Sequence, residues 1–390
     1  MAKSRAQSKT VTALALRGLS FAPSQSWGGV RLVPLLREEV RDDLRLTKRE
    51  YTADVMAVDV GNAAHWSFVP HGIVAEWSTD GTPIVPFGTQ VRHRDGKHVQ
   101  TSAGMVQLAH RMVRREEPTR LRFLPLHLAM EGYLAHFFGG PEIAWGEYSK
   151  GAISTGLSPR VETSVSGAGL PGLSDALRIF EIHEGQVGIL LYVGGALGAA
   201  FVVPHPEDYR ALHTSLIEDF YGELLVYYGL QATAERMECA LPETKVSSLG
   251  QLRGELSAMR AAWATFQEEM GHRLLERELT AQVVYSFGPF SMQHFSTDLR
   301  LKEENHLGEV IMHDDGTLQY LKTYRLSAAQ ARRAYLLKML AACHWNIEAT
   351  ARSLGQSNDE FVLRLDKAGF DYLLKEHVLA AARRHKRNER

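Results

Sequence analysis

The chain has 390 residues, and its 44 Lys and Arg against 45 Asp and Glu give a formal charge of -1, which excludes a uniformly basic surface for nucleic acid or an anionic membrane. At 45% hydrophobic and 23% charged residues it is too apolar for a disordered protein and long enough for two or three folded domains. Cys239 and Cys343 are its two cysteines, and they lie far apart without further ligands at metal-binding spacing. This excludes a disulfide framework and a zinc knuckle, and favours a reducing compartment, so we expect a cytoplasmic protein.

Two apolar segments have the composition of a targeting or membrane element. The run 11–16 is too short for a signal peptide. Residues 185–204 carry no charge, and as a helix they would span about 30 Å, the thickness of a bilayer core. The Gly194-Gly195 pair in the middle, and the lack of basic or aromatic anchors at the ends, favour a buried β-hairpin. We therefore expect no membrane contact.

The first 205 residues are typical of a β-rich domain, with short strands separated by glycine, proline and turn signals such as Thr79-Asp80-Gly81. Pro206, followed by two acidic residues, predicts the start of a helix that reaches 228. The strands expected here are 29–36, 54–60, 66–77, 83–92, 121–128 and 179–181, then the hairpin strands 187–193 and 196–203, with helices at 107–115 and 128–137.

The region 231–326 is predicted to hold a long helix and a small antiparallel sheet. Apolar residues at three- and four-residue steps from Leu252 to Leu274 predict a helix over 249–278 that can cross a domain or pair with a neighbour. Strands are expected at 281–287, 309–312 and 318–323, the last two joined by a turn at Asp314-Asp315-Gly316. After Ser327 the pattern is helical throughout, which marks a domain boundary.

The C-terminal segment has the pattern of three short helices. Ser327 is the expected N-cap of a helix that reaches 343, Asn346 of a helix over 347–354 closed by Gly355, and a third helix covers 359–368 and is closed by Gly369. The apolar residues that would form the core of this bundle are Leu336, Leu340, Ile347, Ala351, Leu354, Phe361, Leu365 and Phe370.

The segment WNIEATARSLGQSNDEFVLRLDKAGF, residues 345–370, resembles the Fis-type helix-turn-helix. The positions that match the family pattern are Asn346, Ala349, Leu354, Gly355, Ser357, Leu365 and Gly369. The resemblance implies a DNA-binding module whose groove-facing helix is 359–367. The residues that it implies for phosphate or base contact, together with the basic tail, are Asn346, Arg352, Ser357, Asn358, Arg364, Lys367, Arg383, Arg384, Lys386 and Arg387.

The charged residues of the C-terminal segment give one argument for DNA binding and one against it. Residues 327–390 hold 12 basic against 7 acidic residues, a local excess of positive charge. The front of the third helix nevertheless carries Asp359 and Glu360, with Asp366 later, where the family pattern usually has basic residues. Carboxylates repel phosphates, and the base that they usually recognise is cytosine, whose amino group donates a hydrogen bond to them. The basic tail either grips phosphates or is a solvated end of the chain.

The upstream region has a second resemblance, carried by residues 16–46 (LRGLSFAPSQSWGGVRLVPLLREEVRDDLRL), 85–102, 123–132 and 179–228. In order and composition these segments resemble the ARPP domain, named for its association with ADP-ribosylglycohydrolases and rhodanese-phosphatases. The resemblance implies a bacterial domain found beside enzymes of stress or conflict systems. It implies no activity, and Glu131 matches an acidic position of unknown role.

Candidate catalytic patterns are weak. The G-x-G-x-x-G at 167–172 is followed by barely one helical turn and by no acidic residue at ribose distance. Of the two E-x-x-H pairs, Glu303 with His306 lies in a polar turn, and Glu269 with His272 lacks the further glutamates of a di-iron bundle. His205 and His213 are explained by helix capping and charge placement as well as by a metal. We expect no cofactor and no metal, and leave open whether the chain is an enzyme.

The sequence therefore predicts an α+β fold, with a β-rich N-terminal domain over 11–230, a long helix plus a small antiparallel sheet over 231–326, and an all-α helix-turn-helix with a basic tail over 327–390. The expected function is DNA binding and transcription regulation in a bacterial stress or conflict system, with sensing by the ARPP-like domain. We expect a homodimer or larger homo-oligomer, since one recognition helix buries little surface. The alternative is an adaptor of a defence assembly that uses a degenerate helix-turn-helix for protein contacts; a metal-dependent hydrolase is the third interpretation.

Overall fold

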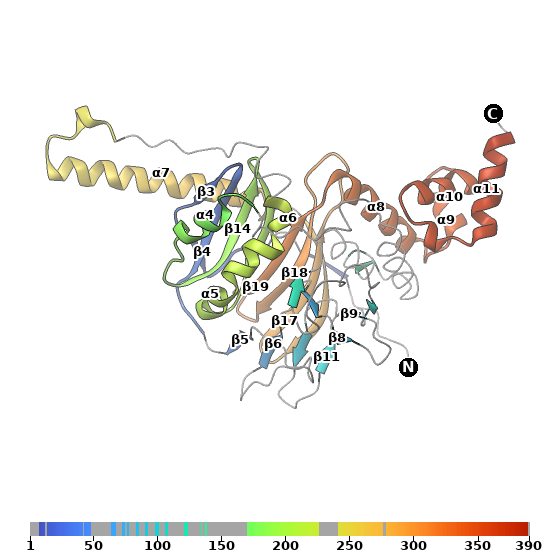
Figure 1. Ribbon diagram of the computed structural model, residues 1–390, viewed down its shortest axis with the longest axis horizontal. Coiled ribbons are helices and arrows are strands. Elements are labelled where there is room, and N and C mark those ends of the chain that lie inside the picture. The colour runs from blue at the N-terminus through green and yellow to red at the C-terminus, as the bar shows by residue number, and fades with distance from the viewer. Residues whose placement is uncertain are drawn as a thin grey trace. The chain divides into compact units, whose positions relative to one another are not determined.

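The structure is a computed structural model, and it describes residues 8–11, 14–41, 43–47, 64–67, 72–74, 76–77, 83–85, 90–92, 98–100, 106–107, 121–123, 134, 137–138, 170–225, 241–275 and 278–388. The chain forms two compact units. The first comprises Met1–Leu46, Gly167–Asp298 and Asn305–Arg325, and the second Thr47–Ser166, Leu299–Glu304 and Leu326–Arg390. The chain therefore contains a large antiparallel sheet in one unit and several C-terminal helices in the other, a mixed α and β protein (Figure 1).

The first unit is built on one ten-stranded antiparallel sheet. Its order is β1-β16-β17-β18-β19-β15-β14-β4-β2, with β3 also paired to β4. The strands are β1 (Ser8–Val11), β2 (Leu19–Phe21), β3 (Gln25–Trp27), β4 (Val30–Arg37), β14 (Gln186–Val193), β15 (Ala196–Val202), β16 (Leu279–Phe287), β17 (Phe290–Thr297), β18 (His306–His313) and β19 (Leu318–Arg325).

The uncharged segment 185–204 forms the predicted β-hairpin. Strands β14 and β15 pair antiparallel across Gly194 and Gly195, whose φ angles of 56° and 76° lie in the left-handed region that glycine adopts freely. The described part of the chain contains no helix long and apolar enough to cross a membrane.

The strands on both sides of residue 230 belong to the same sheet. Strand β15 pairs with β19, with Phe201 opposite Lys322, so the strands expected as a separate small sheet in 231–326 extend the sheet of the upstream domain. A cluster of buried side chains on these strands forms the core, because alternate residues of each strand point to one face. Its members include Val33, Leu35, Val187, Leu190, Ala200, Val202, Ala281, Phe295, Val310 and Leu321.

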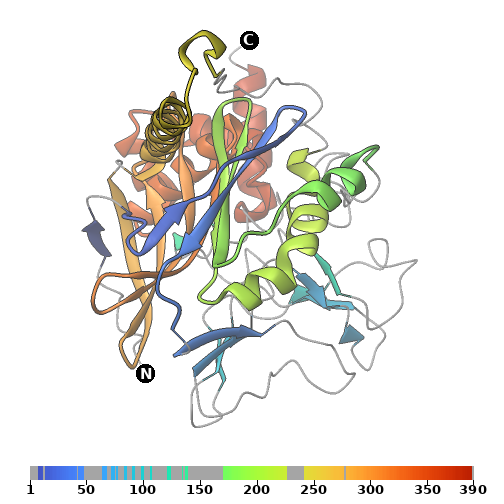
Figure 2. The ribbon, with the colours of Figure 1, turned by 90° about the vertical axis from the view of Figure 1, so that its left-hand side faces the viewer.

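Helices of the first unit lie beside the sheet or extend from it (Figure 2). Helix α5 (Pro206–Ser215) contacts β14 and continues into the π-helix η4 (Leu216–Phe220) and α6 (Gly222–Leu224). The predicted start of this helix is confirmed, since Nδ1 of His205 accepts the N–H of Glu207 at 3.2 Å and Pro206 is the first helical residue. Helix α7 (Leu249–Leu275) confirms the predicted long helix, and the 3-10 turn η6 (Glu243–Lys245) precedes it.

One strand prediction is wrong. Residue Ile179, expected to open a strand over 179–181, ends helix α4 (Leu173–Ile179). Gly172, at a φ of 81°, is the N-cap of this helix, and Leu173 and Ala176 are buried one turn apart. A segment of three residues is too short to distinguish a strand from the last turn of a helix, and here tertiary packing favours the helix.

The second unit contains short strands and the C-terminal helices. Strands β6 (Ala64–Ser67) and β11 (His98–Gln100) pair with β10 (Gln90–Arg92), strands β8 (Glu76–Trp77) and β12 (Val106–Gln107) with β9 (Pro83–Val85), and β7 (Gly72–Val74) with β13 (Leu121–Phe123). Strand β5 (Leu44–Thr47) ends where this unit begins. The expected strand 54–60 and most of the expected helices 107–115 and 128–137 lie outside the described residues.

Candidate functional site

Two of the C-terminal helices begin at the caps predicted for them, Ser327 and Asn346. The C-terminal helices are α8 (Ala328–Ala342), α9 (Ile347–Ser353), α10 (Asn358–Lys367), a 3-10 turn η7 (Asp371–Leu373) and α11 (Glu376–Asn388). Ser327 and Ser357 each form a capping box with the residue three positions on, and Asn346 Oδ1 accepts the N–H three residues later at 2.9 Å. In the capping box at Ser357, the carboxylate of Glu360 accepts hydrogen bonds from Ser357. These hydrogen bonds hold the pKa of Glu360 below its ordinary value.

Helix α10 is held against α8 by one arginine. The guanidinium of Arg333 on α8 donates to the main-chain carbonyl of Ala368 at the end of α10, and its carbon lies 4.4 Å from the centroid of the Phe370 ring. A cation at a helix C-terminus satisfies a free carbonyl and is favoured by the helix dipole. Of the predicted core residues, Leu336, Leu340, Ala351, Phe361, Leu365 and Phe370 are buried, and Ile347 and Leu354 are half-buried.

Helix α11, which the sequence analysis treated only as a basic tail, packs along α10. Arg383 Nη2 lies 3.0 Å from Asp366 Oδ2, and His385 Nδ1 lies 2.7 Å from Asp359 Oδ2. Val362 on α10 is fully buried, which a three-helix bundle with a free third helix would not require. Asp359 and Asp366 of α10 are therefore partnered from α11, over sequence separations of 26 and 17 residues.

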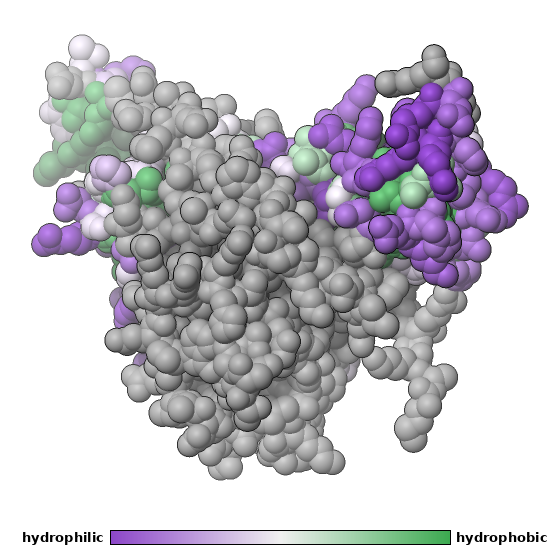
Figure 3. Space-filling view, turned by 45° about the vertical axis from the view of Figure 1, so that its right-hand side comes forward, coloured by the Kyte–Doolittle hydropathy of each residue, from purple (hydrophilic) through white to green (hydrophobic). Residues whose placement is uncertain are grey.

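The residues predicted to contact DNA fall into two groups. Asn346 and Ser357 are helix caps, Arg383 is paired with Asp366, and Arg364 donates to Gln356 Oε1 at 3.2 Å, so these four have structural partners. The others are exposed: Arg352, Asn358, Lys367, Arg384, Lys386 and Arg387. Figure 3 shows that the surface around these helices is mostly hydrophilic.

A row of buried charged side chains crosses the sheet of the first unit. Glu309 on β18 lies between His294 on β17 and Lys322 on β19, and all three are at most 3% exposed. Oε1 of Glu309 is 3.3 Å from His294 Nε2, and Oε2 is 3.0 Å from Lys322 Nζ. Burial lowers the pKa of Lys322, and Glu309 opposes that shift. A buried cluster of this kind either serves a site or fixes the strand register.

This row is not among the sites predicted from the sequence. A signal was present, because a hairpin that turns at Asp314-Asp315-Gly316 places Glu309 opposite Lys322. His294 comes from a strand that was not predicted, and its pairing with Glu309 follows only from the sheet order.

The weak catalytic patterns do not assemble in the described residues. Glu303 pairs with Arg300 at 3.3 Å, whereas His306 begins β18, so the two share no helix face. Nδ1 of His213 contacts the hydroxyl of Tyr209 at 2.9 Å and belongs to a buried pair. No group of three or more His, Cys, Asp and Glu that could hold a metal is found among the residues that the structure describes. The side chains of Glu269 and His272, and residues 167–169, lie outside them.

Comparison with known families identifies a match to the upstream part of the chain. The family model ARPP-2 matches residues 14–288, more than half of the chain. The chain belongs to the ARPP-2 family. No curated protein and no solved structure matches it.

The ARPP-2 match confirms the resemblance found in the upstream segments. It extends past the predicted limit at 230, through α7 and β16, and stops before β17. The buried row from His294 to Lys322 and the four C-terminal helices therefore lie beyond the ARPP-2 match, although β17 to β19 complete the same sheet.

Proposed function

We propose that the C-terminal helices form a Fis-type helix-turn-helix that binds DNA, and that this ARPP-2 protein is a regulator in a bacterial stress or conflict system whose ARPP-2 part senses the signal. Support comes from the succession of α8, α9 and α10, with a tight turn from Leu354 to Ser357 between the last two. The capping of α10 leaves its N-terminus, with exposed Asn358, pointing out of the bundle's core.

One observation carries the proposal. The acidic residues that opposed DNA binding at the sequence level each have a partner within the bundle: His385 for Asp359, Ser357 for Glu360 and Arg383 for Asp366. Lys386 adds a favourable charge beside Glu360. Exposed cations on α9, α10 and α11 are then left to face a polyanion.

The proposed binding mode is dominated by phosphate contacts. Arg384, Lys386 and Arg387 are exposed on α11, and Arg352 and Lys367 are exposed at the ends of α9 and α10. Asn358 is the exposed side chain able to read adenine, while Glu360 is occupied by its cap. We therefore propose salt-sensitive binding with modest sequence preference, by a homodimer that presents two bundles.

The test is a titration of duplex DNA with the full chain at several salt concentrations. The double variant Arg384→Gln, Arg387→Gln should lower the slope of log affinity against log salt by about 2, since each lost phosphate contact contributes about 0.9. A matched control is Arg253→Gln, Arg260→Gln, which removes two exposed arginines from α7. Equal slopes for the two double variants would reject phosphate contact by α11.

The second candidate function is protein contact in a defence assembly. It is favoured by the position of α11, which covers the side of α10 that carries Val362, Asp359 and Asp366. A helix covered on that side has less surface for a DNA groove. Absence of salt-dependent DNA binding by the full chain would favour this adaptor role.

A further inference from the structure

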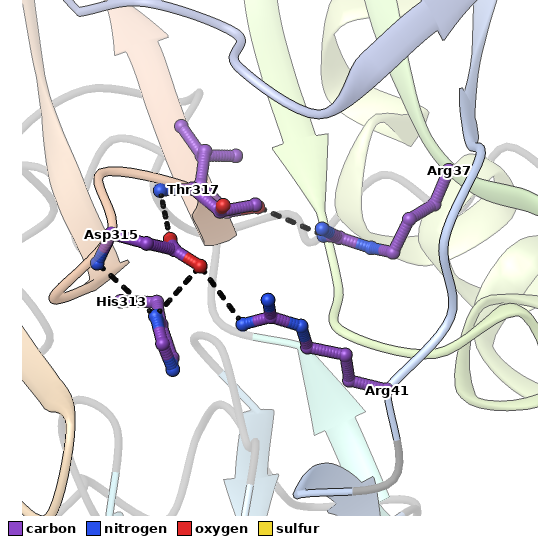
Figure 4. Close-up of polar contacts among 6 residues, drawn as sticks. Arg37, Arg41, His313, Asp315 and Thr317 are labelled. Atoms are coloured by element: carbon purple, nitrogen blue, oxygen red, sulfur yellow. Dashed lines mark hydrogen bonds and ion pairs between the residues drawn. The ribbon is translucent and has the colours of Figure 1, made fainter.

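A buried arginine, Arg37, ends strand β4. Arg37 is only 5% exposed. Its Nη2 donates to the carbonyls of Leu318 at 2.9 Å and Gln319 at 3.3 Å (Figure 4). Its Nε is buried and has no hydrogen-bond partner. Among the residues described, no carboxylate forms an ion pair with it. A buried guanidinium is normally paired, because desolvation without a counter-ion is expensive.

A second arginine, Arg41, increases the excess of positive charge around Arg37. Burial, then the charge of Arg41, lowers the pKa of Arg37 to about 10, whereas Asp43 acts in the opposite direction more weakly. Arg41 is one third exposed and sits at the surface end of the same strand region, and Figure 4 shows both guanidinium groups directed toward the turn between β18 and β19. Two cations therefore converge on one turn, one buried and one at its rim.

The carboxylate of Asp315, in the turn between β18 and β19, is already occupied. Asp315 Oδ2 lies 3.0 Å from Arg41 Nη1 and 3.1 Å from His313 Nδ1, and Oδ1 accepts the N–H of Thr317 at 2.8 Å. The hydrogen bonds from Thr317, then the interaction with His313, hold the pKa of Asp315 below its ordinary value, so it is ionised at neutral pH. Its charge orients Arg41 and does not reach Arg37.

We propose that Arg37 and Arg41 form a binding site for a phosphate group, either free phosphate or the phosphoryl group of a small molecule. Guanidinium groups present several N–H donors in a fixed plane that suits a tetrahedral oxyanion. Arg37 supplies a charge in a low-dielectric setting, where an ion pair is stronger than in water. Arg41, which is partly exposed, is the member of the pair that an entering phosphate group meets first. Both arginines lie within the ARPP-2 match, and the proposed site does not depend on DNA binding by the C-terminal helices.

The experiment is isothermal titration calorimetry of the full chain with inorganic phosphate, with methyl phosphate and acetate as separate ligands at matched ionic strength. We expect binding of phosphate and weaker binding of acetate, and a loss of at least tenfold in phosphate affinity in Arg41→Gln. Equal affinity for methyl phosphate indicates a phosphoryl group of a larger ligand, and binding of inorganic phosphate alone indicates the free anion.

Two control variants test whether other arginines account for the binding of phosphate. The variant Arg384→Gln, Arg387→Gln must bind phosphate as the wild type does, which excludes the C-terminal helices as the source. Arg253→Gln, on exposed α7, must also bind normally. Arg41 is the partly exposed member of the pair, so Arg41→Gln should fold, as thermal unfolding checks. Phosphate binding that is absent in the wild type, or unchanged in Arg41→Gln, overturns the proposal.

Discussion

Glu309 and Lys322 face each other across the β18–β19 pair, with their charged atoms 3.0 Å apart and both residues at most 2% exposed. His294 contacts the other carboxylate oxygen of Glu309. The three side chains form a chain of contacts along one row of a sheet, in which every partner was brought by strand pairing. Substitution of any one of the three should therefore change the environment of the other two.

Lys322→Met should destabilise the protein by about 3 to 5 kcal/mol, because it leaves the Glu309 carboxylate buried without its cation. The double variant Glu309→Leu, Lys322→Met should recover a large part of that loss, since it removes both charges and keeps apolar volume. Urea denaturation of the three proteins gives the free energies of unfolding. A double variant as unstable as the single one would show that packing, and not charge, dominates at this position.

Stability should fall as the pH drops below about 6.5, owing to His213. Burial lowers its pKa below the ordinary value of 6.5, the hydroxyl of Tyr209 contacts Nδ1, and Nε2 is buried without a partner. Between the folded-state pKa and 6.5 the unfolded chain binds more protons than the folded one, so acid favours unfolding, by at most about 1.4 kcal/mol per pH unit.

The measurement is the free energy of unfolding at pH 7.5 and 5.5 for the wild type, His213→Gln and His377→Gln. The first variant should lose part of the pH dependence, while the second, on exposed α11, should keep it. The same pH dependence in all three proteins would assign the effect to other groups.

Two glycines should respond in opposite ways to alanine. A Cβ at Gly308 in β18 would lie 2.1 Å from the carbonyl oxygen of Lys322, a backbone atom that cannot move aside, so Gly308→Ala should destabilise by more than about 1 kcal/mol. A Cβ at Gly254 on α7 would meet no atom within 4 Å, and alanine there should stabilise by about 0.5 to 1 kcal/mol. Thermal unfolding of both variants, at one protein concentration, checks the sign of each change.

Asp366→Asn should strengthen DNA binding if the proposed function holds. It removes a carboxylate from α10 and releases Arg383, which pairs with it at 3.0 Å, to contact phosphate. We expect higher affinity and a salt slope steeper by about 1, which corresponds to one additional phosphate contact. Anisotropy titration with the same duplex measures both, and Asp371→Asn, at an exposed position in η7, is the control. A weaker affinity in Asp366→Asn would mean that the pair is needed to place α11.

Local features of the fold were predictable. The Gly194-Gly195 turn, the start of α5 at Pro206 and the N-caps Ser327 and Asn346 each depend on residues within a few positions, so the chemistry of the sequence determines them. The ARPP-2 relationship was recognised in the same way, from the order of upstream segments, and the family match confirms it. The short strand expected at 179–181 was misread because three residues carry no period.

Only the tertiary structure decided how distant segments combine. The pairing of β15 with β19 joins strands more than a hundred residues apart, and it unites two regions that composition had separated. The side-chain contacts from α11 to Asp359 and Asp366 likewise depend on packing, as does the approach of Arg37 and Arg41 to the β18–β19 turn. A sequence pattern reports which face of an element is apolar, but the partner of a charged side chain is chosen by burial and geometry across the whole sheet or bundle.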